Sequence, residues 1–413
     1  MVSALREAVR WGKRQRLLLR LWRARGEEIK HANAALNWRE FWHGRDRLES
    51  FPRIVQVGTN WTCNLKCNFC RLTLDSTQQQ LKALPKNELE ISPRVLEQVL
   101  ELMPYPEMMT LTPLGEPLLY TKVGRILERH RQLGCRNLAM TTNANLITED
   151  RARLIVEGGV SHLFVSIDSD DPEIYAAMRV RGDLAQVESA LEAINRWKDR
   201  LGSPTPTMTL ASTFMERNVR QMPSLVDFAV RHRFNSYSVQ LMEVENPELE
   251  AEFLGHHVEL TREMVLATLA RAEGRPIEVK IHLALRNLLT NALSLPEQHR
   301  VDSCSEGVTD NFWNGAEPES AGRRLGELST RGRHLTEKCH YPWYFLLIDT
   351  DGDARPCCWA AQSFGNLNRV SFDEAWNGPE AVAMRRNFLN NHIPKSCQGK
   401  HCRVDLDHAG TME

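Results

Sequence analysis

The sequence predicts an α/β fold: a partial (β/α)6 barrel of the TIM type, with an N-terminal helical extension and a small C-terminal domain built from a β-hairpin and a helix. Between residues 53 and 242, short apolar runs alternate six times with amphipathic stretches, which is typical of parallel βα units. Polar motifs follow several of these runs, at the strand ends where such folds gather ligands. A segment containing cysteine, glycine and tryptophan closes the chain.

Each repeated element has a local signal. Ser92 and Pro93 suit the cap and first turn of a helix, and Gly134 suits a helix end. Strands are expected at 53–58, 108–112, 137–141, 160–167, 207–213 and 236–241, and helices at 92–103, 122–133, 148–157, 184–200 and 219–232. Right-handed crossovers would wind these units into an open or partial barrel.

Four segments are expected along the chain: a basic helical extension at 1–50, the core at 51–242, a helical and loop-containing bridge at 243–335, and a compact domain at 336–413. The extension contains the run RWGKRQRLLLRLWRAR. Its functional interpretation is weak contact with a membrane surface or a partner. The alternative is a helix that packs its apolar face on the main domain.

Composition narrows the classes of function. The 413 residues include 52 basic and 53 acidic side chains, so no overall attraction to nucleic acid is indicated. The sequence contains no stretch of about 20 apolar residues, so no transmembrane helix is expected. No apolar core of a signal peptide follows the basic N-terminus. A cytoplasmic location is therefore expected. Thiols stay reduced there, so the ten cysteines indicate metal ligation or catalysis more than disulfides.

Three cysteines follow the first expected strand. Cys63, Cys67 and Cys70 have the spacing C-x3-C-x2-C. Three thiolates on one loop can bind three irons of a cubane cluster and leave the fourth iron open to a small molecule. The alternative is a structural zinc site, which needs a fourth nearby Cys or His; none lies between Trp61 and Glu101.

This loop, with the aromatic Phe69 before its last cysteine, resembles that of the radical SAM superfamily. The resemblance implies a [4Fe–4S] cluster whose open iron binds the amino and carboxylate groups of S-adenosylmethionine. It further implies reductive cleavage to methionine and a 5′-deoxyadenosyl radical, which removes a hydrogen atom from the substrate.

Other strand-end motifs resemble those of the same family, and the alternative for each is an ordinary turn or helix cap. Leu114 replaces the first glycine of the family's GGEP motif. A carboxylate of the cofactor could pair with Arg179 or Arg181, because guanidinium binds carboxylates in a bidentate manner; a solvated surface arginine is the alternative. The residues expected to bind S-adenosylmethionine are Gly115, Glu116, Pro117, Thr142, Asn143, Ser166, Asp168 and Arg179.

The C-terminal segment contains a second group of cysteines. An expected hairpin spans 345–355, and the phrase FGNLNRVSFDEAWNG follows it. This arrangement resembles the SPASM/twitch auxiliary domain, which implies one auxiliary [4Fe–4S] cluster. Its ligands would be Cys339, Cys357, Cys397 and Cys402, with Cys358 as an alternative to Cys357. A structural zinc with the same ligands is the other interpretation.

The favoured reaction is oxidative modification, by dehydrogenation or cross-linking, of a peptide or small metabolite, with flavodoxin or ferredoxin as the reducing partner. One alternative is a redox-neutral epimerase of a sugar or peptide residue, with Cys304 as hydrogen donor; an unreactive loop cysteine is the other interpretation of Cys304. Cys135 is expected in the core. A non-enzymatic iron–sulfur carrier or scaffold is the remaining class.

Overall fold

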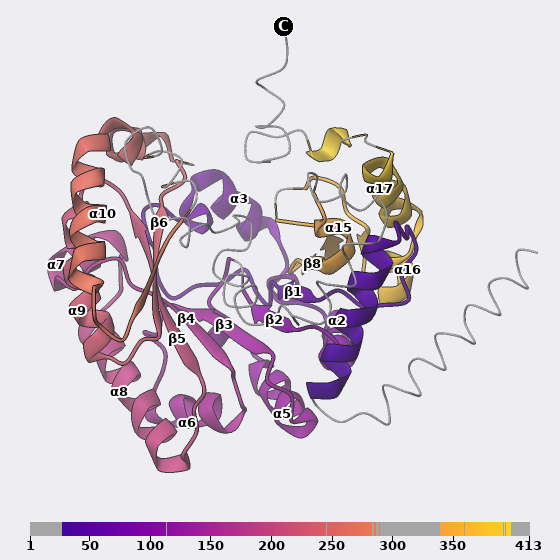
Figure 1. Cartoon of the computed structure of the whole chain (residues 1–413), viewed down its shortest axis with the longest axis horizontal. Coiled ribbons are helices and arrows are strands. Elements are labelled where there is room, and N and C mark those ends of the chain that lie inside the picture. The colour runs from indigo at the N-terminus through magenta and orange to yellow at the C-terminus, as the bar shows by residue number, and fades with distance from the viewer. Residues whose placement is uncertain are drawn as a thin grey trace, which may run out of the picture.

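A curved sheet with helices on its outer side forms the body of the molecule (Figure 1). The computed structural model describes residues 27–112, 114–244, 246–282, 285, 289, 339–358, 360–390, 392 and 394–397. Within these residues the sheet has ten strands in the order β10-β9-β8-β1-β2-β3-β4-β5-β6-β7. This confirms the predicted α/β fold with a parallel sheet.

The strands from β1 to β7 are parallel to their neighbours. Their alternate residues face the two sides of the sheet. One set packs with the helices in the main core, for example Val55, Met140 and Leu210. The strands are β1 Ile54–Val57, β2 Met108–Leu111, β3 Leu138–Thr142, β4 His162–Ser166, β5 Thr207–Phe214, β6 Ser236–Leu241, β7 Glu278–Ile281, β8 Phe345–Ile348, β9 Asp353–Arg355 and β10 Gly365–Asn366.

Several helices begin and end where the sequence predicts, because local capping groups are present. The Ser92 side chain accepts from Val95 N at the start of α4, and Gly134, with φ +63°, ends α5. The helices are α2 Glu27–Trp42, α3 Asp75–Ala83, α4 Pro93–Leu102, α5 Val123–Leu133, α6 Glu149–Glu157, α7 Pro172–Met178, α8 Leu184–Leu201, α9 Ser224–Arg231, α10 Val258–Ala272, α15 Tyr341–Tyr344, α16 Phe372–Trp376 and α17 Pro379–Leu389.

Two expected elements differ from the structure. The helix expected at 219–232 is a 3₁₀ turn, Val219–Gln221, followed by α9, and Pro223 stands between them, where it cannot donate a backbone hydrogen bond. The bridge expected to be helical contains α10 but also β7, which extends the parallel sheet beyond β6. The sequence analysis missed this strand in a short, charged stretch.

The expected C-terminal hairpin is confirmed as β8 and β9, which pair antiparallel. The hairpin does not stand apart from the core, because β8 also pairs in parallel with β1. Phe345 and Leu347 of β8 pack with Ile54, Met108 and other residues in a second cluster on the inner side of the sheet. The C-terminal segment therefore continues the core sheet.

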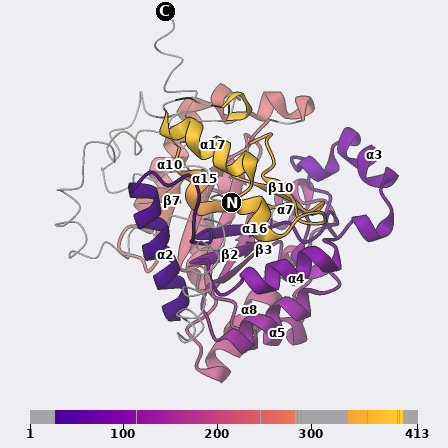
Figure 2. The same cartoon turned by 90° about the vertical axis from the view of Figure 1, so that its right-hand side faces the viewer.

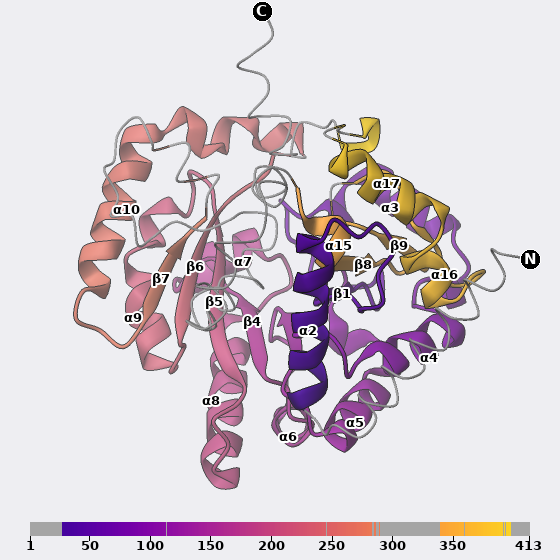
Figure 3. The same cartoon turned by 45° about the vertical axis from the view of Figure 1, so that its right-hand side comes forward.

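The N-terminal helix α2 lies beside α15 and supports this junction (Figures 2 and 3). Asn37 Nδ2 donates to Trp343 O at 2.7 Å, and Trp376 Nε1 donates to Ser50 O at 2.9 Å. The fully buried Arg385 donates from Nε to Pro342 O at 2.8 Å. The basic run at 10–25 lies outside the described residues, so its proposed surface contact stays a prediction.

Among the described helices, none combines the length and apolarity that crossing a membrane requires.

Candidate functional site

The cysteine loop leaves the carboxyl end of β1 and lies against the end of α7. Lys66 N donates to Val180 O at 2.9 Å, and Asn68 N donates to Met178 O at 3.3 Å. Thr73 Oγ1 donates to Cys67 O at 2.8 Å and to Cys70 O at 2.6 Å. The middle and the end of the loop are therefore held by hydrogen bonds to its backbone that do not use the thiols.

The three thiols differ in exposure and in electrostatic surroundings. Cys67 is buried, whereas Cys63 and Cys70 are half-buried. Burial raises the pKa of Cys63 and of Cys67, and the Arg179 charge partly offsets this for Cys67. Iron binding would replace the thiol proton, so cluster assembly at this loop depends on pH.

Gly115 brings the loop after β2 into contact with the cysteine loop. A Cβ at this position would lie 2.2 Å from Asn60 O and 2.9 Å from Thr62 O, both backbone atoms. Glu116 N donates to Thr62 O at 2.8 Å, beside Cys63. Glycine is therefore required by this close approach.

Glu116 is buried and turns toward the end of β3. Its Oε1 accepts from Thr142 Oγ1 at 2.8 Å, and its Oε2 accepts from Asn143 N at 2.9 Å. Burial raises the pKa of Glu116, although these hydrogen bonds act in the opposite direction. The carboxylate thus connects the loops after β2 and β3. A direct contact of Glu116 or Pro117 with a cofactor stays a prediction.

Asn143 links the β3 end to the cysteine loop. Its Nδ2 donates to Asn64 Oδ1 at 2.9 Å and lies 3.8 Å from Cys63 Sγ. Two residues on, Asn145 donates to the Tyr175 hydroxyl at 2.8 Å and accepts from Asp183 N. Asn145 was not among the predicted site residues, although it follows Asn143 after a single alanine.

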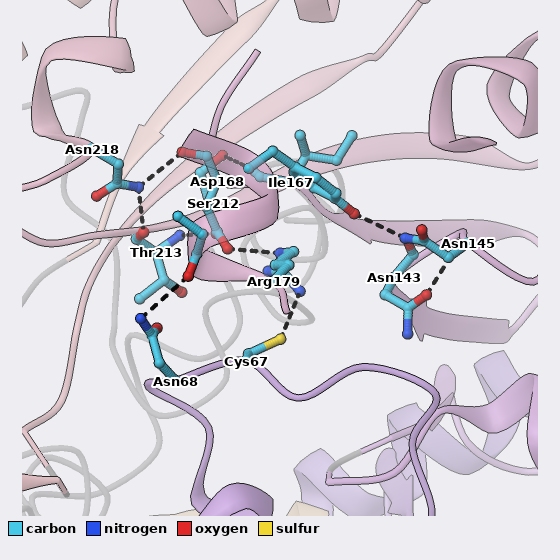
Figure 4. A network of polar contacts seen from close by, with 12 residues as sticks. Cys67, Asn68, Asn143, Asn145, Ile167, Asp168, Arg179, Ser212, Thr213 and Asn218 are labelled. Carbon is cyan, nitrogen blue, oxygen red and sulfur yellow. Dashed lines mark hydrogen bonds and ion pairs between the residues drawn. The ribbon is translucent and has the colours of Figure 1, made fainter. Parts of the chain in front are cut away.

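Asp168 and Arg179 form a buried ion pair beside the cysteine loop (Figure 4). Arg179 Nε lies 2.7 Å from Asp168 Oδ2, and its Nη1 lies 3.9 Å from Cys67 Sγ. Burial alone would lower the pKa of Arg179, but Asp168 and the Cys67 thiolate give a net upward shift. The guanidinium therefore stays charged beside Cys67.

Figure 4 also shows how Asp168 is held. Its Oδ1 accepts from Thr213 N at 2.8 Å, and Asn218 Nδ2 donates to its backbone carbonyl at 2.8 Å. Ser166, the last residue of β4, is half-exposed on the inner side, and Arg181 is exposed. Cofactor binding by Ser166, Asp168 and Arg179 stays a prediction; of the two arginines, Arg179 lies at the cysteine loop.

The C-terminal cysteines lie around the hairpin. Cys357 follows β9, packs against the inner-side cluster and accepts from Ala360 N at 3.2 Å, whereas Cys358 is exposed. Cys339 and Cys397 are half-buried against the main core. Ser396 Oγ donates to Gln362 Oε1 at 3.1 Å, which joins the turn carrying Cys397 to the loop after Cys357.

Cys402 and Cys304 lie outside the described residues, so both assignments stay predictions. Cys135 is buried, as expected, and burial raises its pKa to about 11.

The residues of the first loop fit an iron–sulfur cluster and a small cofactor. In the described parts of the chain, no three His, Cys, Asp or Glu side chains converge on one metal ion. Thiolates are the ligands that such clusters use. The close approach at Gly115 also places the loop after β2 against the backbone of Asn60 and Thr62, next to Cys63 in the sequence.

Two family models match the chain. Residues 62–211 match the Radical SAM superfamily, and residues 339–403 match an iron–sulfur cluster-binding domain, SPASM.

Among curated proteins, the chain is similar to GTP 3′,8-cyclase of Aquifex aeolicus (strain VF5), with 30% identity over 31% of this chain and 39% of that protein. It is also similar to a probable GTP 3′,8-cyclase of Methanococcus maripaludis (strain C5), with 25% identity over 52% of this chain and 66% of that protein. The matched region thus spans less than two thirds of either relative.

Solved structures show the same fold. SuiB of Streptococcus suis bound to S-adenosylmethionine has a TM-score of 0.54 and 15% identity, over 81% of this chain and 68% of that one. Native anSMEcpe with bound AdoMet has a TM-score of 0.54 and 16% identity, over 85% and 86% of the two chains.

The chain belongs to the radical SAM superfamily and has a C-terminal SPASM-type iron–sulfur domain, as the sequence predicts. Its cofactors are a [4Fe–4S] cluster and S-adenosylmethionine, together with auxiliary iron–sulfur ligation in the SPASM domain. That this domain holds one auxiliary cluster stays a prediction.

Proposed function

We propose that this protein cleaves S-adenosylmethionine reductively and oxidises a peptide or small metabolite by dehydrogenation or cross-linking. Cys63, Cys67 and Cys70 would hold the [4Fe–4S] cluster, which would supply one electron for the reductive cleavage of S-adenosylmethionine and so for hydrogen abstraction from the substrate. A cluster held by the cysteines of the C-terminal domain would accept the second electron of the oxidation, and the substrate would release a proton to the solvent.

The contacts of the cysteine loop with the segments after β2, β3 and α7 carry this proposal. Asn143 Nδ2 lies 3.8 Å from Cys63 Sγ, and Arg179 Nη1 lies 3.9 Å from Cys67 Sγ. Glu116 N binds the backbone beside Cys63. These groups can donate hydrogen bonds to cluster sulfur or to a carboxylate, and they hold the loop rigidly. Such an arrangement supports a site for a cluster and its small-molecule ligand.

The test is anaerobic reconstitution with iron and sulfide, followed by reduction with dithionite in the presence of S-adenosylmethionine. We expect 5′-deoxyadenosine by mass spectrometry, and its loss when Cys63, Cys67 and Cys70 are all changed to Ala. Cys135→Ala is the matched control, since Cys135 is also buried but lies between α5 and β3. Equal iron content and cleavage in the triple variant would refute the assignment.

The oxidative step has its own test. One 5′-deoxyadenosine should form for each product that has lost two electrons. A product with the same number of electrons as the substrate would instead favour the epimerase alternative, and Cys304→Ala would then test the expected hydrogen donor. Clusters that can be reduced but never cleave S-adenosylmethionine would favour an electron carrier or scaffold.

A second candidate is the cyclisation of a purine nucleotide. It is supported by the two curated relatives named GTP 3′,8-cyclase, one of which matches over 52% of this chain. Consumption of GTP together with 5′-deoxyadenosine formation would support it, and unchanged GTP during active cleavage would refute it.

We propose flavodoxin or ferredoxin as the physiological reductant and the cytoplasm as the location, because a reducing compartment keeps unliganded thiols free for cluster assembly. Replacing dithionite with each reduced carrier protein tests the first point.

A further inference from the structure

A short backbone pairing places Cys67 of the cysteine loop opposite Arg179 at the end of α7. One hydrogen bond lies a residue to each side of both, from Lys66 N to Val180 O at 2.9 Å and from Asn68 N to Met178 O at 3.3 Å. The two segments therefore run in opposite directions, and their register decides which side chain lies beside the Cys67 thiol.

Three groups hold the Arg179 guanidinium. Its Nε lies 2.7 Å from Asp168 Oδ2, and its Nη1 lies 3.9 Å from Cys67 Sγ, as Figure 4 shows. Its Cζ lies 5.7 Å from the centre of the Phe69 ring. Asp168 is itself fixed, because its Oδ1 accepts from Thr213 N at 2.8 Å. Since the Arg179 side chain is only 9% exposed, protein groups determine its orientation more than water does.

Asp168 does not cancel the effect of Arg179 on the thiol. Burial is the largest influence and raises the pKa of Cys67, but the Arg179 charge lowers this pKa by more than the Asp168 charge raises it. The guanidinium presents Nη1 to the sulfur and Nε to the carboxylate. Little water separates these groups, so the contact is only weakly screened. Arg179 therefore stabilises negative charge on the Cys67 sulfur.

We propose that Arg179 raises the reduction potential of the [4Fe–4S] cluster held by Cys63, Cys67 and Cys70, through the contact of Nη1 with Cys67 Sγ. Asp168 is the positioning residue for the guanidinium. One electron from a reductant such as dithionite or flavodoxin makes the ligand sulfurs more negative, so a donor beside one of them stabilises the reduced state more than the oxidised state. Hydrogen bonds to sulfur are among the features that set the potentials of such clusters.

A higher potential would allow a weaker biological reductant to supply this electron. The inference rests on the cluster that the proposed function requires, but not on the identity of the substrate or the type of reaction. It also does not require that Arg179 contact S-adenosylmethionine.

The test is a redox titration of the whole reconstituted chain with dithionite, without S-adenosylmethionine, followed by electron paramagnetic resonance. The signal of this cluster is the one absent when Cys63, Cys67 and Cys70 are all changed to Ala. The double variant Asp168→Asn, Arg179→Met removes the ion pair without leaving either charge buried alone. We expect reduction of its cluster to become about tenfold less favourable, a fall of about 59 mV for a one-electron couple.

Two single variants separate the contact with sulfur from the charge. Arg179→Lys keeps a positive charge that can pair with Asp168, but an ammonium lacks the second arm of the guanidinium that reaches Cys67. A smaller fall in the potential is therefore expected. Arg181→Met is the matched control, because it removes the same charge from an exposed arginine two residues away, and it should have the wild-type potential.

A wild-type potential in the double variant overturns the inference, as does an equal fall in Arg181→Met. If the double variant assembles no cluster, Arg179→Lys decides, and a wild-type potential there has the same consequence. If Arg181→Met retains the cluster but no Arg179 variant does, Arg179 serves assembly of the site and the inference is rejected.

Measurement of 5′-deoxyadenosine in the same preparations separates this inference from the proposed function. If the potential falls as expected but the wild-type protein never cleaves S-adenosylmethionine, only the proposed function fails. If the wild-type protein cleaves S-adenosylmethionine and the potential is unchanged in the double variant, only this inference fails.

Discussion

Gly115→Ala offers a direct test of the contact between the β2 loop and the cysteine loop. The added Cβ would lie 2.2 Å from Asn60 O, and Asn60 is a backbone neighbour that cannot rotate away. The two loops must part by roughly 1 Å to restore ordinary van der Waals contact. This would stretch the bond from Glu116 N to Thr62 O, now 2.8 Å long. Overpacking of this kind costs about 1–3 kcal/mol.

We therefore expect Gly115→Ala to lower the free energy of unfolding by about 1–3 kcal/mol in urea titrations and to weaken S-adenosylmethionine binding measured by calorimetry. Gly124→Ala is the matched control, because Gly124 lies in α5 and its added Cβ would meet no heavy atom within 4 Å. The free energy of unfolding of Gly124→Ala should exceed that of wild type by at most about 1 kcal/mol. If the two variants behave alike, the close approach does not constrain the site.

Three further predictions concern buried polar groups. His162 has a pKa of about 4 when folded, below its usual 6.5, so its contribution to stability is present above pH 6.5 and is lost as the pH falls. Between pH 7 and pH 5 the free energy of unfolding should fall by roughly 2 kcal/mol. This fall should be absent in His162→Gln, as urea titrations at the two pH values would show. Asp168→Asn leaves Arg179 buried without its carboxylate and should cost about 3–5 kcal/mol, measured in the same way. Arg385→Met leaves the buried Pro342 O and Trp376 O and the partly buried Asp46 O without their donor, and it should cost about 3 kcal/mol or more in chemical denaturation.

Each of these three predictions has a result that would contradict it, and two of them have a matched control variant. Acid sensitivity that persists in His162→Gln would show that another group is responsible. Glu97→Gln removes an exposed ion pair with Arg125 at 2.9 Å and should cost at most about 1 kcal/mol; an equal cost for Asp168→Asn would contradict the buried pair. Arg386→Met changes the exposed neighbour of Arg385, and similar losses in both variants would reject the role of burial.

The local elements followed from the sequence because their signals lie within a few residues. Ser92 caps α4 and Gly134 ends α5 as predicted, since capping uses hydrogen bonds over one helical turn. β7 was missed although Val279 and Ile281 alternate with polar residues. A strand of four residues in a charged stretch gives a weak pattern. Its polar residues, Glu278 and Lys280, are exposed or only partly buried.

Part of the candidate site could also be predicted from short stretches of sequence. Cys63, Cys67 and Cys70 stand close in sequence, so their spacing indicated a cluster loop without knowledge of the fold. The pairing of Asp168 with Arg179, and the turn of Glu116 toward Thr142, could not be predicted in this way. Each requires that separate strand ends meet at one edge of the sheet.

By itself, the sequence determined the cysteine ligand candidates, the family, and most strands and helices, because these depend on spacing and periodicity within short stretches. Only the tertiary structure decided that β8 pairs with β1, almost three hundred residues away, that Gly115 must be glycine, and that Asp168 pairs with Arg179. Such contacts depend on which surfaces are buried together when distant segments pack, and no local pattern encodes that choice.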